Sequence, residues 1–314
     1  MAIADGVAGG PASPVDASPA EASSRAAIGA GVLCYLIWGF APLFFQAMGR
    51  LGADSWEILA HRAVWGTLIA WVFVLLARQG GQVAEVLRSP RRLAALALSA
   101  LLIGANWALY VWGVNSGRVL ESSLGYYLTP LLNMAAGVLI FRERFDILGL
   151  GAIVLAGIGV ALQGLALGHF PWMAVILALT FGAYGIVRKQ VQADAQTGLF
   201  VECLFLAVPG ALWMAHLTLT GQGHMDDSPA AAAWLLAAGP ITAIPLVLFA
   251  WAARRMPLSA MGFLQFIGPT IGFGIGLAQG EAFTALRAVS FAFIWAGAAT
   301  YIFGLWRRTR SLGA

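Results

Sequence analysis

Charged side chains are scarce in this sequence of 314 residues, since only 10% of them are Asp, Glu, Lys or Arg, against about 25% in soluble domains. Hydrophobic residues make up 60% of the chain, and the mean hydropathy is +0.82. These values exclude a soluble globular domain and indicate an integral membrane protein. The net charge of +4 comes from basic residues dispersed singly or in pairs, so no nucleic-acid-binding face is expected.

Cysteine is almost absent, and several chemical motifs are missing. Cys34 and Cys203 both lie inside apolar runs, so we expect two buried small side chains and no disulfide framework. The chain has no phosphate-binding loop, no HExxH, no paired Cys clusters and no Gly-x-Ser-x-Gly elbow. Glu57 and His61 are one helical turn apart, but no second His or Cys cluster completes a metal site. We therefore expect no metal, no cofactor and no catalytic residue.

Ten apolar segments follow an N-terminal stretch, residues 1–26, that is mostly Ala, Gly, Pro and Ser and is predicted to be a disordered tail. Each segment has about 17 to 23 residues, enough for a helix to cross ~30 Å. The fold class predicted is therefore all-α, a polytopic membrane protein with ten transmembrane helices. The segments are 27–48, 57–77, 93–114, 121–141, 146–167, 171–187, 198–220, 231–253, 257–279 and 285–306.

The direction of the spans follows from the Lys and Arg residues, which favour cytoplasmic segments. With a cytoplasmic N-terminus, fourteen of them fall inside, three fall outside (Arg50, Arg118 and Arg287), and Arg62 lies within a span. Both termini are therefore predicted to be cytoplasmic, with residues 307–314 as a second tail.

Two stretches resemble each other in the positions of their special residues. "GYYLTPLLNMAAGVLIFRE" begins at Gly125 and "GFLQFIGPTIGFGIGLAQGE" at Gly262, and in both a Gly and an aromatic residue precede a Pro and a distal Glu. The match pairs the fourth span with the ninth, so the two copies cross the membrane in opposite directions. This predicts two inverted five-helix repeats, 27–167 and 171–306, which are typical of secondary transporters. The alternative is that Pro130 and Pro269 only kink tightly packed helices.

Polar residues recur near the middle of the predicted spans. Asn106 and Tyr110 share one face of the third span, and Tyr126, Pro130 and Asn133 share one face of the fourth. Gln265 lies one turn before Pro269. Two interpretations stay open, namely hydrogen bonds between helices and a substrate pathway lined by these side chains. The predicted pathway residues are Asn106, Tyr110, Tyr126, Pro130, Asn133, Gln265 and Pro269.

Charged residues open the second span, where Glu57, His61 and Arg62 precede a long uncharged run. Arg62 lies only about 8 Å from the predicted outer end, so snorkelling to the interface is one explanation. The other is a charged vestibule, in which Glu57 pairs with His61 and Arg62 pairs with Glu121 at the same depth of the fourth span. Glu202 occupies the corresponding place in the seventh span, near the cytoplasmic side, where an interfacial cap is the alternative.

The motifs together resemble those of a known family. "YLIWGFAPLFF" in the first span is similar to the drug/metabolite transporter superfamily with its EamA-type repeats. Within that superfamily, several motifs resemble those of the RarD group of permeases, and the matches together extend from about Gly31 to Trp306. The motifs are "EILAHR", "IGANW", "LESSLGYY", "PLLN", "GIVRK", "AQTG" and "GFLQFIGPT". The resemblance implies an inner-membrane protein of ten helices with both ends in the cytoplasm. The group's name is tied to chloramphenicol, and the N-terminal tail has no counterpart in the family pattern.

The function predicted is a secondary permease that moves a small organic metabolite or drug-like solute by alternating access, coupled to an ion or to exchange. Glu121 and His61 are the candidates for proton coupling. Aromatic residues would suit a planar substrate, namely Trp38, Trp107, Trp112, Tyr126, Tyr127 and Phe263. A membrane-embedded enzyme acting on a lipid or isoprenoid and a non-catalytic scaffold are the rival classes. The expected partners are the solute and the lipid bilayer, without nucleic acid, and a homodimer is left open.

Overall fold

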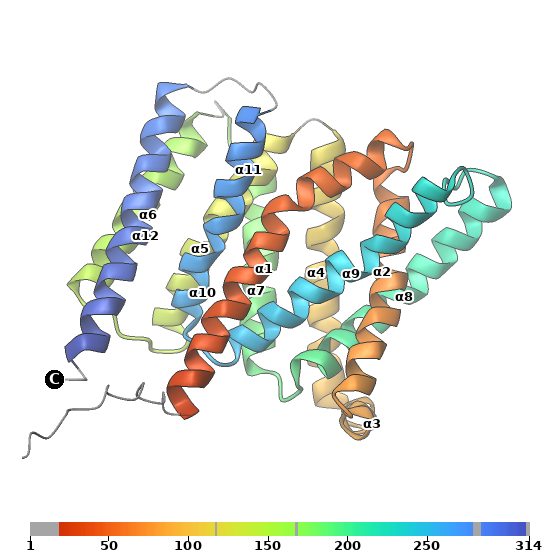
Figure 1. Cartoon of the computed structure of the whole chain (residues 1–314), viewed down its shortest axis with the longest axis horizontal. Helices are drawn as coiled ribbons and strands as arrows, with labels where there is room; N and C mark the ends of the chain where they lie inside the picture. Colours follow the sequence, from red (N-terminus) through yellow and green to blue (C-terminus); the bar gives the residue numbers. More distant parts are fainter. Residues whose placement is uncertain (1–18, 117, 167–168, 279–283, 312–314) are drawn as a thin grey trace, which may run out of the picture.

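The computed structural model describes residues 19–116, 118–166, 169–278 and 284–311, and in this part of the chain every regular element is a helix. Figure 1 shows the helices side by side, with α6 and α12 at one end of the long axis and α2 and α8 at the other. The helices are α1 (Pro19–Arg50), α2 (Ser55–Leu76), α3 (Gly80–Arg88), α4 (Pro90–Asn115), α5 (Val119–Leu139), α6 (Ile147–Leu165), α7 (Trp172–Gln190), α8 (Ala195–Thr220), α9 (Pro229–Ala253), α10 (Leu258–Gln265), α11 (Ile267–Ala278) and α12 (Ala285–Ser311).

Each of the ten ranges predicted from the sequence contains a helix, but the lengths differ. Among the described residues, eight helices are long and apolar enough to cross a membrane, and a shorter apolar stretch, Leu124–Leu139, lies in α5. The ninth predicted range contains two helices, α10 and α11. The all-α membrane class is therefore confirmed, whereas the number of ten crossings stays a prediction.

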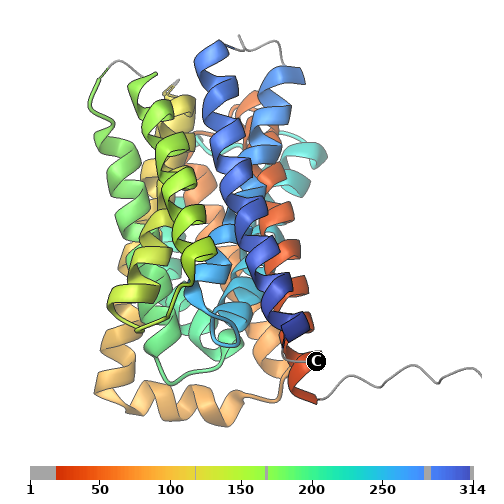
Figure 2. The same ribbon diagram turned by 90° about the vertical axis from the view of Figure 1, so that its left-hand side faces the viewer.

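The ends of the chain differ from the predicted tails. Helix α1 begins at Pro19 and so occupies part of the predicted tail 1–26, while residues 1–18 lie outside the described residues. Helix α12 continues to Ser311, beyond the predicted boundary at residue 306. Figure 2 shows that α1 begins and α12 ends at the same end of the bundle, which we call the terminal end.

Local sequence signals set several helix boundaries. The Asp54 carboxylate accepts from the Glu57 amide over 2.7 Å at the start of α2, and Asp146 accepts from the Gly149 amide over 2.9 Å at the start of α6. Such caps satisfy amide groups that have no partner within a helix. Gly221 ends α8 with a positive φ of 66°, a conformation that glycine adopts without steric cost.

The break between α10 and α11 has a direct cause in Pro269. A proline inside a helix removes one N–H group, and its ring clashes with the carbonyl four residues earlier. That carbonyl belongs to Gln265, the last residue of α10. Pro130 does not break its helix, because α5 runs without interruption from Val119 to Leu139.

Helix α3 was not predicted, since residues 78–92 lie between two of the predicted apolar segments. Val83 and Val86 are buried on one face of this short helix. Val86 packs with Leu96, Val191 and Val201 in a small core cluster. Helix α3 therefore covers the terminal end of α4 and α8.

Candidate functional site

A cavity of about 110 Å³ lies inside the bundle, between helices from both halves of the sequence. Its walls come from α1, α2, α4, α5, α7, α9, α10 and α11. Arg62 and Tyr126, each the eighth residue of its helix, place it about 10 Å below the starts of α2 and α5. The cavity is lined by Tyr35, Trp38, Gly39, Ala41, Pro42, Phe45, Arg62, Asn106, Trp107, Tyr110, Tyr126, Phe181, Ile241, Thr242, Gln265, Gly268, Pro269 and Gly272.

Arg62 contributes the one charge among these lining residues. Its side chain is buried, with 6% of the residue exposed. The Nε atom donates to the Thr242 hydroxyl over 3.1 Å. The guanidinium carbon lies 4.4 Å from the centre of the Trp107 ring and 5.0 Å from that of Phe45, so cation–π attraction offsets part of the cost of burial.

Three side-chain amides lie in or beside the cavity. Asn133 donates from Nδ2 to Oε1 of Gln265 over 3.1 Å, which joins α5 to α10. Asn106 donates from Nδ2 to the Leu177 carbonyl over 2.9 Å and to the Thr180 hydroxyl over 3.0 Å, which joins α4 to α7. These bonds satisfy the acceptor of Gln265 and the donors of Asn106, so the Gln265 NH₂ group and the Asn106 oxygen are the ends available to a ligand.

Prolines loosen the backbone around the cavity. A helical proline deprives the carbonyl four residues earlier of its usual N–H partner. For Pro42, Pro130 and Pro269, the affected carbonyls belong to Trp38, Tyr126 and Gln265, all of which line the cavity. In a membrane such carbonyls are satisfied by neighbouring side chains, water or a ligand.

Aromatic rings form most of the apolar wall. Trp38 lies 5.5 Å from Phe181 and 5.7 Å from Tyr35, measured between ring centres. Tyr110 meets Tyr126 edge-on at 5.2 Å. Such rings offer flat surfaces with positive edges, which suit another aromatic group.

Five of the seven predicted pathway residues line the cavity, namely Asn106, Tyr110, Tyr126, Gln265 and Pro269. Asn133 and Pro130 stand behind it. Asn133 holds Gln265, and the Pro130 carbonyl lies 2.9 Å from the position of a Cβ atom on Gly262, so α5 and α10 touch there through their backbones.

Of the six aromatic residues predicted to suit a planar substrate, Trp38, Trp107 and Tyr126 line the cavity. Tyr127 packs on Phe291, Phe263 stacks on Tyr301, and Trp112 is exposed.

The predicted pairing of Glu57 with His61 is wrong. The Glu57 carboxylate accepts from the backbone amide of His224 and contacts the His224 ring nitrogen Nδ1, both at 2.7 Å. His61 instead accepts at Nδ1 from the indole N–H of Trp65 over 2.7 Å. A glutamate in the first turn of α2 can reach the loop after α8, which sequence spacing alone does not reveal. The Glu121 side chain lies outside the described residues, so its pairing with Arg62 stays a prediction.

Glu202 lies apart from these groups and is buried near the terminal end. It accepts from the Ser99 hydroxyl over 2.5 Å, and its carboxylate is 3.6 Å from the Arg188 guanidinium. Arg188 is fully buried and also donates to the Ala195 carbonyl. Glu57, His61, Arg62 and Glu202 therefore have different hydrogen-bond and ion-pair partners, and the shared charged vestibule stays a prediction.

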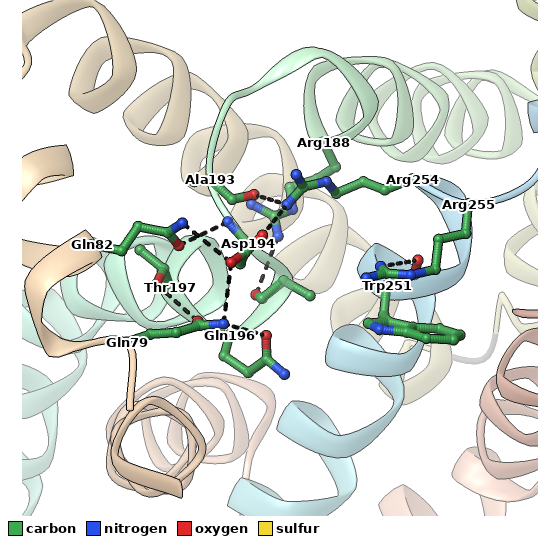
Figure 3. Close-up of polar contacts among 11 residues, drawn as sticks. Gln79, Gln82, Arg188, Ala193, Asp194, Gln196, Thr197, Trp251, Arg254 and Arg255 are labelled. Atoms are coloured by element: carbon green, nitrogen blue, oxygen red, sulfur yellow. Dashed lines mark hydrogen bonds and ion pairs between the residues drawn. The ribbon is translucent and has the colours of Figure 1, made fainter. Parts of the chain in front are cut away.

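A polar network joins segments at the terminal end and is drawn in Figure 3. The Asp194 carboxylate accepts from Arg254 over 3.0 Å, from Gln82 over 3.2 Å and from Gln79 over 3.3 Å, and it thereby ties α9 to the α3 region. Arg254 also donates to the Ala193 carbonyl. A second contact at this end joins Lys189 to Glu143 over 3.6 Å. Polar contacts therefore join several helices at the terminal end.

Several lining residues were missed by the sequence interpretation. Tyr35, Phe45 and Thr242 line the cavity, but none was predicted as a site residue. Thr242 had one usable signal, since Pro240 and Pro245 flank it within α9. Tyr35 and Phe45 lie in an apolar helix whose sequence pattern does not distinguish them from residues that only pack against other helices.

The observations define a class, a multi-pass helical membrane protein with a partly polar cavity among its helices. Residues 25–165 match the model of the EamA-like transporter family. The chain belongs to the RarD-type permeases of this drug/metabolite transporter superfamily. It is therefore a membrane permease by family, which confirms the class predicted from the sequence.

The relatives cover most of the chain. An uncharacterized transporter of Vibrio cholerae is 40% identical over 284 residues, which are 88% of this chain and 92% of the relative. The protein RarD of Escherichia coli is 38% identical over 85% of this chain and 90% of its own length. The chloramphenicol-sensitive protein RarD of Pseudomonas aeruginosa is 30% identical over 77% of this chain and 82% of its own. One solved crystal structure matches with a TM-score of 0.69 at 19% identity, over 91% of this chain and 99% of the other, which supports the fold.

Proposed function

We propose that the protein is an inner-membrane secondary transporter that carries a small organic solute by alternating access, with ten spans in two inverted repeats. The observation that carries this proposal is the cavity, which lies between helices of both halves and is separated from the terminal end by polar contacts. A carrier needs such a site, reached from one side at a time. The absence of any nucleotide-binding motif in the sequence leaves an ion gradient or exchange as the source of energy.

The packing of the helices supports the inverted repeat. If α1, α2, α4, α5 and α6 correspond to α7, α8, α9, α10–α11 and α12, most of the extensive contacts between helices have a counterpart, whereas the contact between α5 and α6 has none of similar extent. The contact of α1 with α9 corresponds to that of α7 with α4. In the same way, the contact of α2 with α9 corresponds to that of α8 with α4, and the contact of α5 with α7 corresponds to that of α11 with α1. Three further contacts join a helix of the first half to its own counterpart in the second, namely α2 with α8, α5 with α10 and α6 with α12.

Backbone contacts between α6 and α12 repeat this relationship at the level of atoms. A Cβ atom on Gly159 would lie 2.7 Å from the Ser290 carbonyl, and one on Gly297 would lie 2.7 Å from the Ala152 carbonyl. The same interval of 138 residues separates Gly159 from Gly297 and Ala152 from Ser290. A two-fold axis through the contact accounts for this equality, and it favours two copies of one ancestral unit.

The orientation proposed puts the terminal end in the cytoplasm. The basic residues Arg78, Arg254 and Arg255 belong to connections at that end, and Arg188 lies in the last turn of α7, as the positive-inside rule requires. The cavity is then closed toward the cytoplasm, and transport requires that the contacts of Asp194, Lys189 and Arg188 with their partners rearrange.

The test of this function is solute flux through the purified protein. Proteoliposomes that contain the protein should take up or exchange at least one member of a panel of radiolabelled metabolites and drug-like solutes, with and without an imposed pH gradient. Empty liposomes and liposomes with heat-unfolded protein serve as controls. Chemical alteration of a solute without net movement would favour a membrane-embedded enzyme instead.

A further inference from the structure

The charge in the cavity is not balanced by any carboxylate among the described residues. Within this part of the chain, no Asp or Glu lies within ion-pair distance of Arg62, and its Nη1 atom has no hydrogen-bond partner. Thr242 is bonded to Nε, and the Trp107 and Phe45 rings cover the guanidinium. A buried charge without a hydrogen-bonded counter-ion is costly. Such a group, at the wall of a cavity, marks the place where an anion gains most.

Two further groups of the cavity can donate to an anion, although the Asn106 oxygen there is an acceptor. Gln265 uses its oxygen for Asn133, which leaves its NH₂ group as a donor. The Tyr35 hydroxyl is buried without a partner. Donors therefore outnumber charged acceptors here, since no carboxylate is among the lining residues.

The apolar part of the cavity wall indicates which organic group should carry the anionic group. Rings of Trp38, Phe45, Trp107 and Phe181 surround the space together with those of Tyr110 and Tyr126. Aromatic pairs gain contact energy beyond the area that they bury. A bare inorganic anion would leave this surface unused.

We propose that the cavity selects an organic carboxylate with an aromatic body, and that Arg62 supplies the counter-charge. The bidentate donor edge of a guanidinium matches the two oxygens of a carboxylate. The inference rests on the proposed function in taking the bound molecule as the transported solute, but binding can be measured without transport.

The test compares carboxylates with their neutral amides. Purified protein in nanodiscs is titrated by calorimetry with benzoate, 3-phenylpropionate and indole-3-acetate, and with the primary amide of each. At least one carboxylate should bind about tenfold more tightly than its amide, because a hydrogen bond to a charged group is more stable than a neutral one by about 1.4 kcal/mol, which is tenfold in affinity. Equal binding of each pair, or no binding of any carboxylate, would overturn the proposal.

Variants assign the selectivity to Arg62. Arg62→Met should remove the preference for the carboxylate, and Arg62→Lys should retain part of it. Arg91→Met is the matched control, since Arg91 is exposed at the start of α4 and its loss should change nothing. If Arg62→Met does not fold, the comparison of carboxylate with amide in the wild-type protein still decides the charge preference. Unchanged preference in folded Arg62→Met would overturn the role of this residue.

The two proposals fail in different ways. If carboxylates bind selectively but no solute crosses the bilayer, the anion site stands and the transport function fails. If neutral solutes are transported and carboxylates neither bind nor compete, the function stands and the anion site fails. In the second case Glu121, whose side chain lies outside the described residues, becomes the candidate that neutralises Arg62.

Discussion

Arg62 of α2 donates to Thr242 of α9 across an interval of 180 residues. This bond joins the first half of the chain to the second at the wall of the cavity. In alternating access the two halves move relative to each other, so a residue that bridges them senses that motion. If the protein works by the proposed alternating access, the charge at this junction connects binding of a solute with the conformation of the protein.

Filling the cavity should block transport without unfolding the protein. Gly272 lines the cavity, and a Cβ atom on it meets no atom within 4 Å, so Gly272→Phe would put a ring where the solute binds. Gly274 lies on the same helix but is exposed, and it also has open space around it. We expect Gly272→Phe to reduce flux in proteoliposomes at least tenfold and Gly274→Phe to leave it near the wild-type value. Equal flux through both variants would exclude the cavity as the pathway.

The contact between α6 and α12 should be sensitive to one methyl group at two matched places. Gly159→Ala and Gly297→Ala each force a Cβ atom against a backbone carbonyl at 2.7 Å. Overpacking of this kind costs about 1 to 3 kcal/mol, so the midpoint of thermal unfolding in detergent should fall by a similar amount in both variants. Gly157 has nothing within 4 Å, and Gly157→Ala is the control that should be neutral. A large loss in one glycine variant and none in the other would contradict the two-fold relationship.

The orientation of the chain can be tested with single cysteines. Gly81→Cys and Arg255→Cys at the terminal end should resist an impermeant thiol reagent in intact cells, whereas Asp226→Cys in the loop between α8 and α9 should react. All three positions are exposed in the structure, so protection would come from the membrane. The native Cys34 and Cys203 are buried and give little background. Labelling of Gly81→Cys in intact cells would reverse the assignment.

Much of the fold could be predicted because a membrane-spanning helix appears in the sequence as an apolar segment of characteristic length. Every predicted range contains a helix, and helical spacing placed Asn106 and Tyr110 on the face that lines the cavity. The short helix α3 was missed because its two buried valines give too brief a pattern in a polar connection. Sequence spacing also could not give His224 as the partner of Glu57, since a tertiary contact between a helix start and a distant loop leaves no periodic signal.

The buried ion pair at the terminal end should depend on both of its members. Arg188→Met leaves the carboxylate of Glu202 without its cation in a buried position. Breaking a buried pair in this way costs about 3 to 5 kcal/mol, whereas replacing both members with apolar residues is often neutral. Arg188→Met should therefore lower the midpoint of thermal unfolding sharply, and Arg188→Met with Glu202→Met should recover most of the loss. Additive losses in the double variant would show that the two groups act independently.

The Asp194 network should hold the terminal end closed. Asp194 stands directly before α8, but its carboxylate does not cap that helix; it binds Arg254, Gln79 and Gln82 instead. A single exposed ion pair contributes only about 0 to 1 kcal/mol, but this carboxylate joins three segments at once. Asp194→Ala should therefore leave the helices intact and increase opening of the terminal end. The measurement is the reaction rate of a permeant maleimide with Val86→Cys, which replaces a buried side chain of α3. We expect a severalfold faster reaction in Asp194→Ala, and no change in the control Asp227→Ala, which alters an exposed carboxylate in the loop between α8 and α9. An unchanged rate in Asp194→Ala would mean that apolar packing of Val86 and its neighbours, rather than this network, keeps that end closed.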